Sequence, residues 1–407
     1  MAQYTPIAPS LTTANAPHSP MRHLCIGRQS AAFISRGHPW LRKDRFTGSL
    51  AGLDNGDVVT LCDEQRRPLA SALIDREHPT ICARVFHRQG DRDFDPVAAC
   101  TRALQQRTKL LSQGDTNCLR LIHGEGDYLP GIRVERLGPA LHVVVMSCCI
   151  RPYVERIASY CADYCGIPGH QVVIREHLDD QRRKPTRARM LDGSPLDPDW
   201  QVPGQELGVP VCVQPAAGLA TGIYVDQRGT RRWLAQRCAG GRVLNLFAYT
   251  GLFSTSMLVA GAAQAVSVDL SAPALALAQE NARIAQVAER HQVIHGDCLS
   301  FCQENGEQYD WIICDPPTAA QGGRGWVARR DYPKLLQAMV PLLSPQGYML
   351  ACVNTLGKPY DLGRALGAAG LQTLAPERAP QLEEDIPQRK GFHEGRPYQL
   401  FVAQHAS

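Results

Sequence analysis

The sequence lacks any run of about 18 consecutive apolar residues, so it predicts no membrane-spanning helix. We recognise no secretory signal at its start, and its 15 cysteines are scattered along the chain. Several stand inside apolar segments, as Cys82, Cys212 and Cys314 do. Cysteines in that setting are typical of reduced thiols that pack as small hydrophobic side chains. The pattern therefore indicates a cytoplasmic protein.

The sequence also lacks cysteine and histidine at zinc-finger spacing. Cys161 and Cys165 are four residues apart, as are Cys298 and Cys302, but neither pair has further ligands near it. We therefore expect no metal site. The net charge of +4 permits a nucleic-acid partner without requiring one.

Acidic residues are absent from residues 1–22, which are rich in alanine, proline, serine and threonine and favour a disordered tail. Residues 23–99 then hold short apolar runs at 58–62, 69–74 and 80–86, separated by turn residues. Short strands at this spacing are typical of a small β-barrel.

Residues 100–210 mix both kinds of element and predict an α+β central domain. A helix comes first, a hairpin follows at 119–135, and an apolar strand at 141–146. A basic run at 181–189 contains Arg182, Arg183 and Lys184. Such runs form solvated loops or contact phosphates, and both readings stay open here.

The most informative stretch begins with an apolar strand at 243–246, a turn at 247–251 and a helix at 252–259. A strand that enters a helix through a glycine-containing turn places backbone N–H groups beside a ligand. Acids then end the next predicted strands, at Asp269, Asp297 and Asp315. Each acid alone could be a helix cap, but the series predicts a ligand crevice at one edge of a parallel sheet.

The spacing suggests a role for each acid. Asp269 lies about twenty residues after the turn, where a carboxylate binds a ribose diol. Asp297 could accept a hydrogen bond from an adenine amine. Asp315 precedes Pro316 and Pro317, a rigid turn whose carbonyls are free to face a substrate.

Residues 211–407 continue the alternation of strands and helices and predict an α/β doubly wound sheet. We expect helices at 272–287, 331–343 and 361–369, and strands at 348–354 and 398–403. The turn lacks the Gly-x-Gly-x-x-Gly pattern, which disfavours a dinucleotide oxidoreductase.

This order of motifs resembles the class I S-adenosylmethionine methyltransferases, with their Rossmann-like sheet. A wider resemblance is to the bacterial 23S rRNA cytosine-C5 methyltransferases, which begin with a PUA domain. It rests on Ser35–Trp40, on the Gly-Glu-x-Asp-x-Leu-Pro-Gly element at 124–131, on Asp226-Gln-Arg228, and on the loop at 385–396.

The resemblance implies S-adenosylmethionine as cofactor and 23S rRNA, or its large-subunit precursor, as partner. It implies that the PUA-like and central domains hold the RNA, through Arg36, His38 and Trp40 and through the basic run. Trp40 as a core residue and the arginines as solvated surface is the alternative. A homodimer stays open. The implied cofactor-binding residues are Gln227, Asn245, Phe247, Tyr249, Thr250, Gly251, Asp269, Asp297 and Asp315. Trp326, in the loop after Asp315, could stack on a base or pack internally.

The chain departs from the family at the base chemistry. The family's catalytic cysteine position falls on Asn354, and Cys352 lies two residues earlier. Those two side chains share one strand face, roughly 6.5–7 Å apart. Cys352 is thus either a shifted nucleophile or a buried strand residue. Without a thiolate the site suits a base nitrogen, held by Asp315, the Pro316 carbonyl and Asn354.

Two other functions remain open from the sequence. The chain could bind RNA with an altered, inactive methyltransferase domain, or it could methylate a small molecule. The PUA-like segment argues against the second of these.

Overall fold

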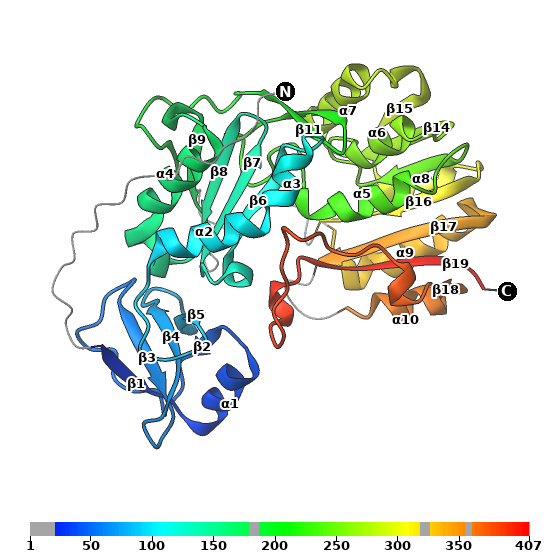
Figure 1. Cartoon of the computed structure of the whole chain (residues 1–407). Coiled ribbons are helices and arrows are strands. Elements are labelled where there is room, and N and C mark those ends of the chain that lie inside the picture. The colour runs from blue at the N-terminus through cyan, green and yellow to red at the C-terminus, as the bar shows by residue number, and fades with distance from the viewer. Residues whose placement is uncertain (1–20, 179–186, 318–325, 355–359, 407) are drawn as a thin grey trace. The chain divides into compact units, whose positions relative to one another are not determined.

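The computed structural model of the chain (Figure 1) describes residues 21–178, 187–317, 326–354 and 360–406. Residues 1–20, most of the predicted tail, lie outside these ranges, as do Arg182, Arg183 and Lys184. Within the described ranges, no helix is long and apolar enough to cross a membrane.

The chain divides into two compact units. Unit 1 consists of residues up to Val202, Gln214–Leu219 and Glu384–Gly395, and unit 2 of Pro203–Val213, Ala220–Glu383 and Arg396 onward. Each unit is therefore built from segments that are far apart in the sequence.

The first sheet of unit 1 has the strand order β1-β3-β4-β5-β2. Its elements are β1 (Arg22–Cys25), α1 (Arg28–Arg36), β2 (Trp40–Arg42), β3 (Val58–Cys62), β4 (Pro68–Ile74) and β5 (Ile81–His87). Strands β3 to β5 match the predicted strands. Helix α1 was missed, because Gly27 precedes it with no side-chain cap and only Ala31 and Ile34 are buried. Arg22 was also wrongly placed in the tail, since it pairs with Val59.

The second sheet of unit 1 has the order β10-β9-β8-β7-β6. Its elements are α2 (Pro96–Gln106), α3 (Thr108–Gln113), β6 (Cys118–His123), β7 (Ile132–Leu137), β8 (Ala140–Val145), α4 (Val154–Cys165), β9 (Val172–Glu176) and β10 (Arg187–Met190). The predicted hairpin is β6 and β7. Helix α2 starts before residue 100, because the Asp95 carboxylate caps it through Val97 and Ala98.

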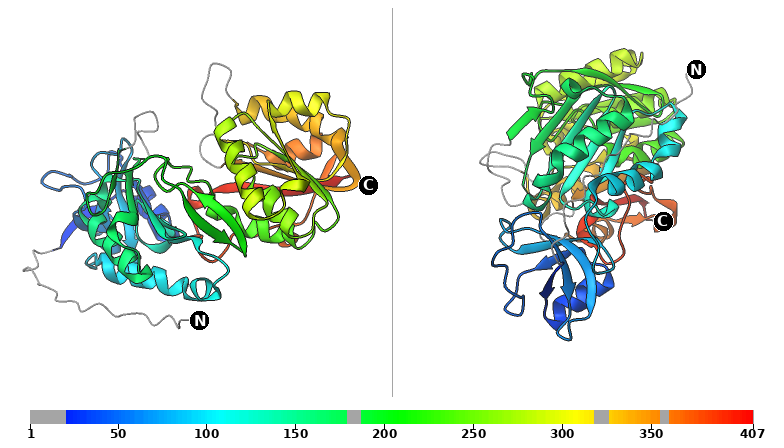
Figure 2. Two further views of the ribbon diagram at one scale, coloured as in Figure 1. Left: turned by 90° about the horizontal axis from the view of Figure 1, so that it is seen from above. Right: turned by 60° about the vertical axis from the view of Figure 1, so that its left-hand side comes forward.

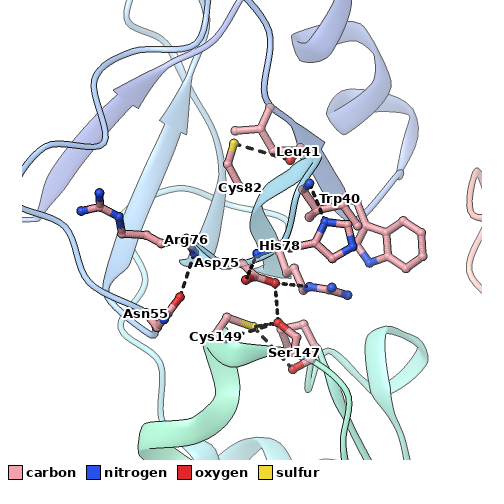
Figure 3. A network of polar contacts seen from close by, with 12 residues as sticks. Trp40, Leu41, Asn55, Asp75, Arg76, His78, Cys82, Ser147 and Cys149 are labelled. Carbon is pink, nitrogen blue, oxygen red and sulfur yellow. Dashed lines mark hydrogen bonds and ion pairs between the residues drawn. The ribbon is translucent and has the colours of Figure 1, made fainter. Parts of the chain in front are cut away.

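A buried carboxylate joins the two sheets of unit 1 (Figure 3). Asp75, directly after β4, is 1% exposed. It accepts hydrogen bonds from Arg84 Nε at 3.1 Å and from Ser147 Oγ at 2.6 Å. Since a buried charge is costly unless it is paired, these partners fix how the sheets meet.

The sheet of unit 2 has the order β15-β14-β13-β16-β17-β19-β18. β13 to β17 are parallel neighbours, and β19 runs antiparallel to β17. This confirms the predicted doubly wound sheet. Its strands are β13 (Arg242–Leu246), β14 (Gln264–Asp269), β15 (His291–His295), β16 (Tyr309–Cys314), β17 (Leu343–Asn354), β18 (Leu371–Thr373) and β19 (Tyr398–His405). A separate hairpin is β11 (Val202–Glu206) and β12 (Val209–Val213).

Helices cover both faces of this sheet (Figures 1 and 2). They are α5 (Arg228–Ala235), α6 (Leu252–Val259), α7 (Ala272–Ile284), α8 (Cys298–Glu304), α9 (Ala328–Met339) and α10 (Leu362–Ala368). One core packs α8, α9 and α10 on Cys314 and Ala351, and the other packs α5, α6 and α7 on Ile313 and Cys352. Alternating strand residues thus face opposite cores.

The predicted bounds of two helices, α7 and α9, were wrong by three or four residues. α7 ends at Ile284, and Gln286 after it has a left-handed φ of 58°. α9 runs from Ala328 to Met339, because the Asp331 carboxylate accepts from Val327 N at 2.7 Å and Pro341 stops the helix.

Residues Glu384–Gly395, hereafter the strap, belong to unit 1 although both flanking segments belong to unit 2. Arg107 Nη2 donates to the Asp385 carbonyl at 3.0 Å. The backbone N–H of Arg120 donates to the Asp385 carboxylate at 2.9 Å. The ring of Phe392 lies 4.8 Å from that of Trp40. These buried contacts make the strap a structural part of unit 1.

Candidate functional site

The turn between β13 and α6 has an unusual backbone. Phe247, Tyr249 and Gly251 all have left-handed φ values, of 54°, 50° and 68°. Such a conformation costs free energy for a residue other than glycine, and it persists where the surroundings impose it. The turn ends at the N-terminus of α6, which has no side-chain cap, so its first N–H groups suit a ligand.

Gly222, which precedes β13 in the chain, stabilises the turn Phe247–Gly251 through two hydrogen bonds. Its backbone N–H donates to Tyr249 Oη at 2.8 Å, and its carbonyl accepts from Thr250 Oγ1 at 2.7 Å. Burial raises the pKa of Tyr249, so the phenol stays neutral. Tyr249 and Thr250 thus shape the turn. No local pattern marks Gly222, apart from its place shortly before Asp226-Gln-Arg228.

Gly251 is required by packing as well as by its φ. A Cβ on Gly251 would lie 2.8 Å from Ala278 Cβ of α7. Asn245 points into the interior, where it donates to Ser254 Oγ of α6 at 3.1 Å and is 1% exposed. Its contacts join β13 to α6, and the cofactor role predicted for Asn245 stays a prediction.

Asp269 joins the turn to α7. Its Oδ2 accepts from Tyr249 N and its Oδ1 from Ser271 N, both at 2.8 Å. The side chain is half-buried at the end of β14, and each oxygen keeps a second lone pair. A carboxylate held in this way fits a ribose diol.

Asp297 is exposed and caps α8. Its Oδ1 accepts from Ser300 N at 2.9 Å and from Ser300 Oγ at 3.1 Å. The helix-cap role is therefore realised, and the predicted contact with adenine stays a prediction.

The third acid belongs to a buried polar cluster. Gln227, in the turn Val225–Gln227 before α5, donates from Nε2 to Asp315 Oδ2 at 3.1 Å. The same nitrogen lies 3.8 Å from Cys352 Sγ. Burial and the charge of Asp226 raise the pKa of Asp315 to about 6. Burial also raises the pKa of Cys352 well above its ordinary value, so this thiol stays protonated.

Asn354 and Pro316 border this cluster. Asn354 ends β17, is half-buried and pairs with Tyr398 of β19. Pro316 is buried directly after Asp315. Tyr332, which sequence reasoning missed, donates from Oη to the Cys352 carbonyl at 2.8 Å. The structure thus brings Asp315 and Cys352 together through Gln227, whereas Pro316 and Asn354 adjoin them along the chain at the carboxyl ends of the neighbouring strands β16 and β17, and their catalytic roles stay a prediction.

The aromatic residues predicted to meet RNA have internal contacts. Trp40 Nε1 donates to Glu125 at 2.8 Å, and His38 Nε2 lies 3.4 Å from Glu394. Arg36 is exposed at the end of α1. In unit 2, the ring of Trp326 lies 5.0 Å from that of Phe247. Packing accounts for both tryptophans, and RNA contact by Arg36, His38 and Trp40 stays a prediction.

The sheet order, the turn of β13 and the acids after β14, β15 and β16 together define a class I S-adenosylmethionine-dependent methyltransferase. The residues fit that cofactor: the half-buried Asp269 suits its ribose, and the uncapped N-terminus of α6 and the half-buried Phe247 border the same edge.

Comparison with known proteins agrees with this assignment to the S-adenosylmethionine-dependent methyltransferases. A family described as S-adenosylmethionine-dependent methyltransferase matches residues 120–369, and a PUA-like domain matches residues 26–88. The chain is 30% identical over 363 residues to ribosomal RNA large subunit methyltransferase I of Yersinia pseudotuberculosis and of Yersinia pestis. Each alignment covers 83% of this chain and 86% of the relative. The chain therefore belongs to the S-adenosylmethionine-dependent methyltransferase family, in the branch of ribosomal RNA large subunit methyltransferase I.

Solved structures share the fold. SMU.776, a methyltransferase complexed with SAH, superposes with a TM-score of 0.77 at 20% identity. A methyltransferase from Streptococcus mutans gives 0.76, also at 20% identity. Both matches cover 94% of this chain and 100% of the other.

We expect Asp269→Ala to weaken cofactor binding by about 10- to 100-fold, because hydrogen bonds to a charged group contribute about 1.5–3 kcal/mol. Isothermal titration calorimetry with S-adenosylhomocysteine would measure this. Glu289→Ala, at an exposed acid elsewhere in unit 2, is the control and should leave affinity unchanged. Equal affinity of the Asp269 variant and the control would remove Asp269 from the cofactor site.

Proposed function

We propose that this protein methylates a base of large-subunit rRNA, as 23S rRNA or its precursor, in the cytoplasm. The observation that carries the proposal is the combination of a PUA-like segment, at residues 26–88, with a methyltransferase domain in one chain. PUA-like domains suit structured RNA, and the relatives are named for methylation of large-subunit rRNA. RNA-modifying enzymes of this kind act on a base taken out of its stack.

The roles of the residues follow from their positions. When bound, S-adenosylmethionine supplies an electrophilic methyl group on a sulfonium. Asp269 and the turn Phe247–Gly251 would hold it at the edge of the sheet. Asp315 and Asn354, which end neighbouring strands, would orient the base by hydrogen bonds.

The target atom that the site favours is a base nitrogen. Methylation of cytosine carbon 5 needs a thiolate to add to carbon 6. Cys352 is fully buried, and both its burial and the neighbouring Asp315 keep its thiol protonated. A nitrogen needs only alignment and a hydrogen-bond acceptor, which Asp315 offers.

The test is methylation of unmodified 23S rRNA with labelled cofactor, followed by nucleoside mass spectrometry. We expect a methylated guanine or adenine at pH 8. Cys352→Ala should keep activity within about fivefold, while Asn354→Ala should lose about 10- to 100-fold, as for a lost hydrogen bond in the reacting complex.

Other products would change the conclusion. 5-Methylcytidine that disappears in Cys352→Ala would make Cys352 the nucleophile and overturn the nitrogen target. Cofactor and RNA binding without turnover would instead favour an RNA-binding protein with an inactive catalytic domain. Absence of RNA binding, with cofactor bound, would favour a small-molecule substrate.

A further inference from the structure

Gln227 lies at the centre of the buried cluster. It is 3% exposed, directly before α5, and it was predicted to bind the cofactor. Its side chain makes contacts to three other side chains of unit 2, Asp315, Cys352 and Thr230, and the predicted cofactor role stays a prediction.

These contacts fix the orientation of the Gln227 amide. Thr230 Oγ1 donates to Gln227 Oε1 at 2.7 Å, so the amide nitrogen must point the other way. There, Nε2 donates one hydrogen to Asp315 Oδ2 at 3.1 Å and directs the other toward Cys352 Sγ at 3.8 Å. A flipped amide would place its oxygen against the Asp315 carboxylate, which is repulsive.

Asp315 receives a second donor from the strand beside it. The Cys352 thiol, 3.8 Å from the Gln227 nitrogen that donates to Asp315, stays protonated because it is buried, and its interaction with the Asp315 carboxylate lowers the pKa of Asp315. Gln227, directly before α5, and Cys352 on β17 thus approach one carboxylate from two elements. Two donors from fixed elements leave the carboxylate little rotational freedom, as a positioned acceptor requires.

We propose that Gln227 is a positioning residue, which together with Cys352 orients the Asp315 carboxylate to accept an N–H of an amino group on the target base. This inference rests on the proposed function and narrows it to bases that carry an exocyclic amine beside the reacting atom. It also gives Cys352 a role as a hydrogen-bond donor in place of a nucleophile.

The inference predicts how Asp315 titrates. Donors to a carboxylate favour its ionised form, so loss of Gln227 should raise the pKa of Asp315 above about 6. The other titratable or charged groups that act on this carboxylate stay in place in such a variant: Asp226, Arg231, Cys314, Tyr332, Cys352 and Tyr398.

The experiment measures the Asp315 titration directly, without RNA. The full chain carries ¹³C-labelled aspartate, and Asp315→Asn assigns the carboxyl resonance. We expect a midpoint near 6 in the wild type and a rise of at least about one pH unit in Gln227→Leu and Gln227→Glu. The Glu variant keeps the shape of the side chain if the Leu variant fails to fold. Gln236→Leu, at an exposed glutamine after α5, should leave the midpoint unchanged.

A second readout uses the RNA assay. In the Gln227 variants the acid limb of the kcat/KM profile should shift to higher pH, together with the titration midpoint of Asp315. The value of kcat should fall about tenfold, while cofactor affinity changes little. Thr230→Val, which frees the amide to rotate, should give a smaller shift in the same direction. Thr230→Ser should restore the wild-type profile.

Three results would overturn the inference. An unchanged midpoint in both Gln227 variants would show that the amide does not act on Asp315. A weaker cofactor affinity with an unchanged midpoint would return Gln227 to the cofactor site. A lower melting temperature as the sole change would make its role structural. A shifted midpoint in a protein that does not methylate rRNA would refute the proposed function and leave the positioning contact intact.

Discussion

Asp315→Asn is expected to lower kcat/KM by about 10²- to 10⁴-fold, the range for loss of a group that handles a proton or N–H in the reacting complex. Asparagine keeps the shape of the side chain but replaces one acceptor oxygen with a donor. The acid limb of the kcat/KM profile, which reports ionisation in the free enzyme, should disappear with it. Steady-state kinetics between pH 5 and 8 would measure both effects.

The same substitution should stabilise the folded protein at neutral pH. Burial raises the pKa of Asp315 from 3.8 to about 6, so between these values the folded protein holds a proton that the unfolded chain has released. The contribution of Asp315 to stability therefore falls as the pH rises through this window and is fully lost above about 6. Roughly 2–3 kcal/mol should be recovered by asparagine at pH 7.5.

Urea unfolding at pH 4 and pH 7.5 would show whether Asp315→Asn raises or lowers the free energy of unfolding. The variant should gain stability over the wild type at pH 7.5 and lose most of that advantage at pH 4. An Asp315→Asn variant that is both active and no more stable would remove Asp315 from the reaction and from the buried cluster alike.

Arg107→Met is expected to destabilise unit 1 by about 3–5 kcal/mol, the cost of leaving a buried charge without its partner. Arg107 is 0% exposed. Its two terminal nitrogens each donate to the Asp127 carboxylate at 2.7 Å, and one of them also donates to the Asp385 carbonyl. Methionine fills similar space, so the loss should arise from the stranded Asp127 and Asp385 acceptors.

Urea unfolding followed by circular dichroism would measure this loss. Arg102→Met is the matched control, since Arg102 is exposed on α2, the helix that ends directly before Arg107, and it should stay within about 0.5 kcal/mol of the wild type. Arg107→Met with Asp127→Leu should recover much of the stability, because both charges are then absent. If Arg107→Met alone is as stable as Arg102→Met, water must reach the pair formed by Arg107 and Asp127.

The sheet of unit 2 could be predicted because the signals for its strands and for its ligand-binding edge lie close together in the sequence. Buried parallel strands read as short apolar runs, and the acids that follow them mark the edge where ligands bind. Asp269 was placed at a strand end from its spacing after the turn, and Asp315 from the apolar run before it and the two prolines after it. The helix α1 escaped because Gly27 provides no capping side chain and the helix buries little of its surface.

The contacts that organise the site could not be predicted in the same way. Gly222 reaches Tyr249 across 27 positions, and Gln227 reaches Asp315 across 88. Such pairs depend on how helices pack on the sheet, and no local pattern marks them. For the same reason, the sequence left open whether Trp40 meets RNA or packs in the core, and the structure shows that Glu125 and Phe392 hold it inside unit 1.

The strap imposes an order on synthesis. Residues up to Val202 leave the ribosome first, but unit 1 is complete only when Gly395 has been made, 193 residues later (395 − 202). At 5–20 residues per second this delay is about 10–40 s. Throughout that interval the Asp385 oxygens that accept hydrogen bonds from Arg107 and from the backbone N–H of Arg120 have not yet been synthesised. The first half of the nascent chain must therefore remain soluble with its own interior unfinished, and a fragment that stops at Val202 stays in that condition permanently.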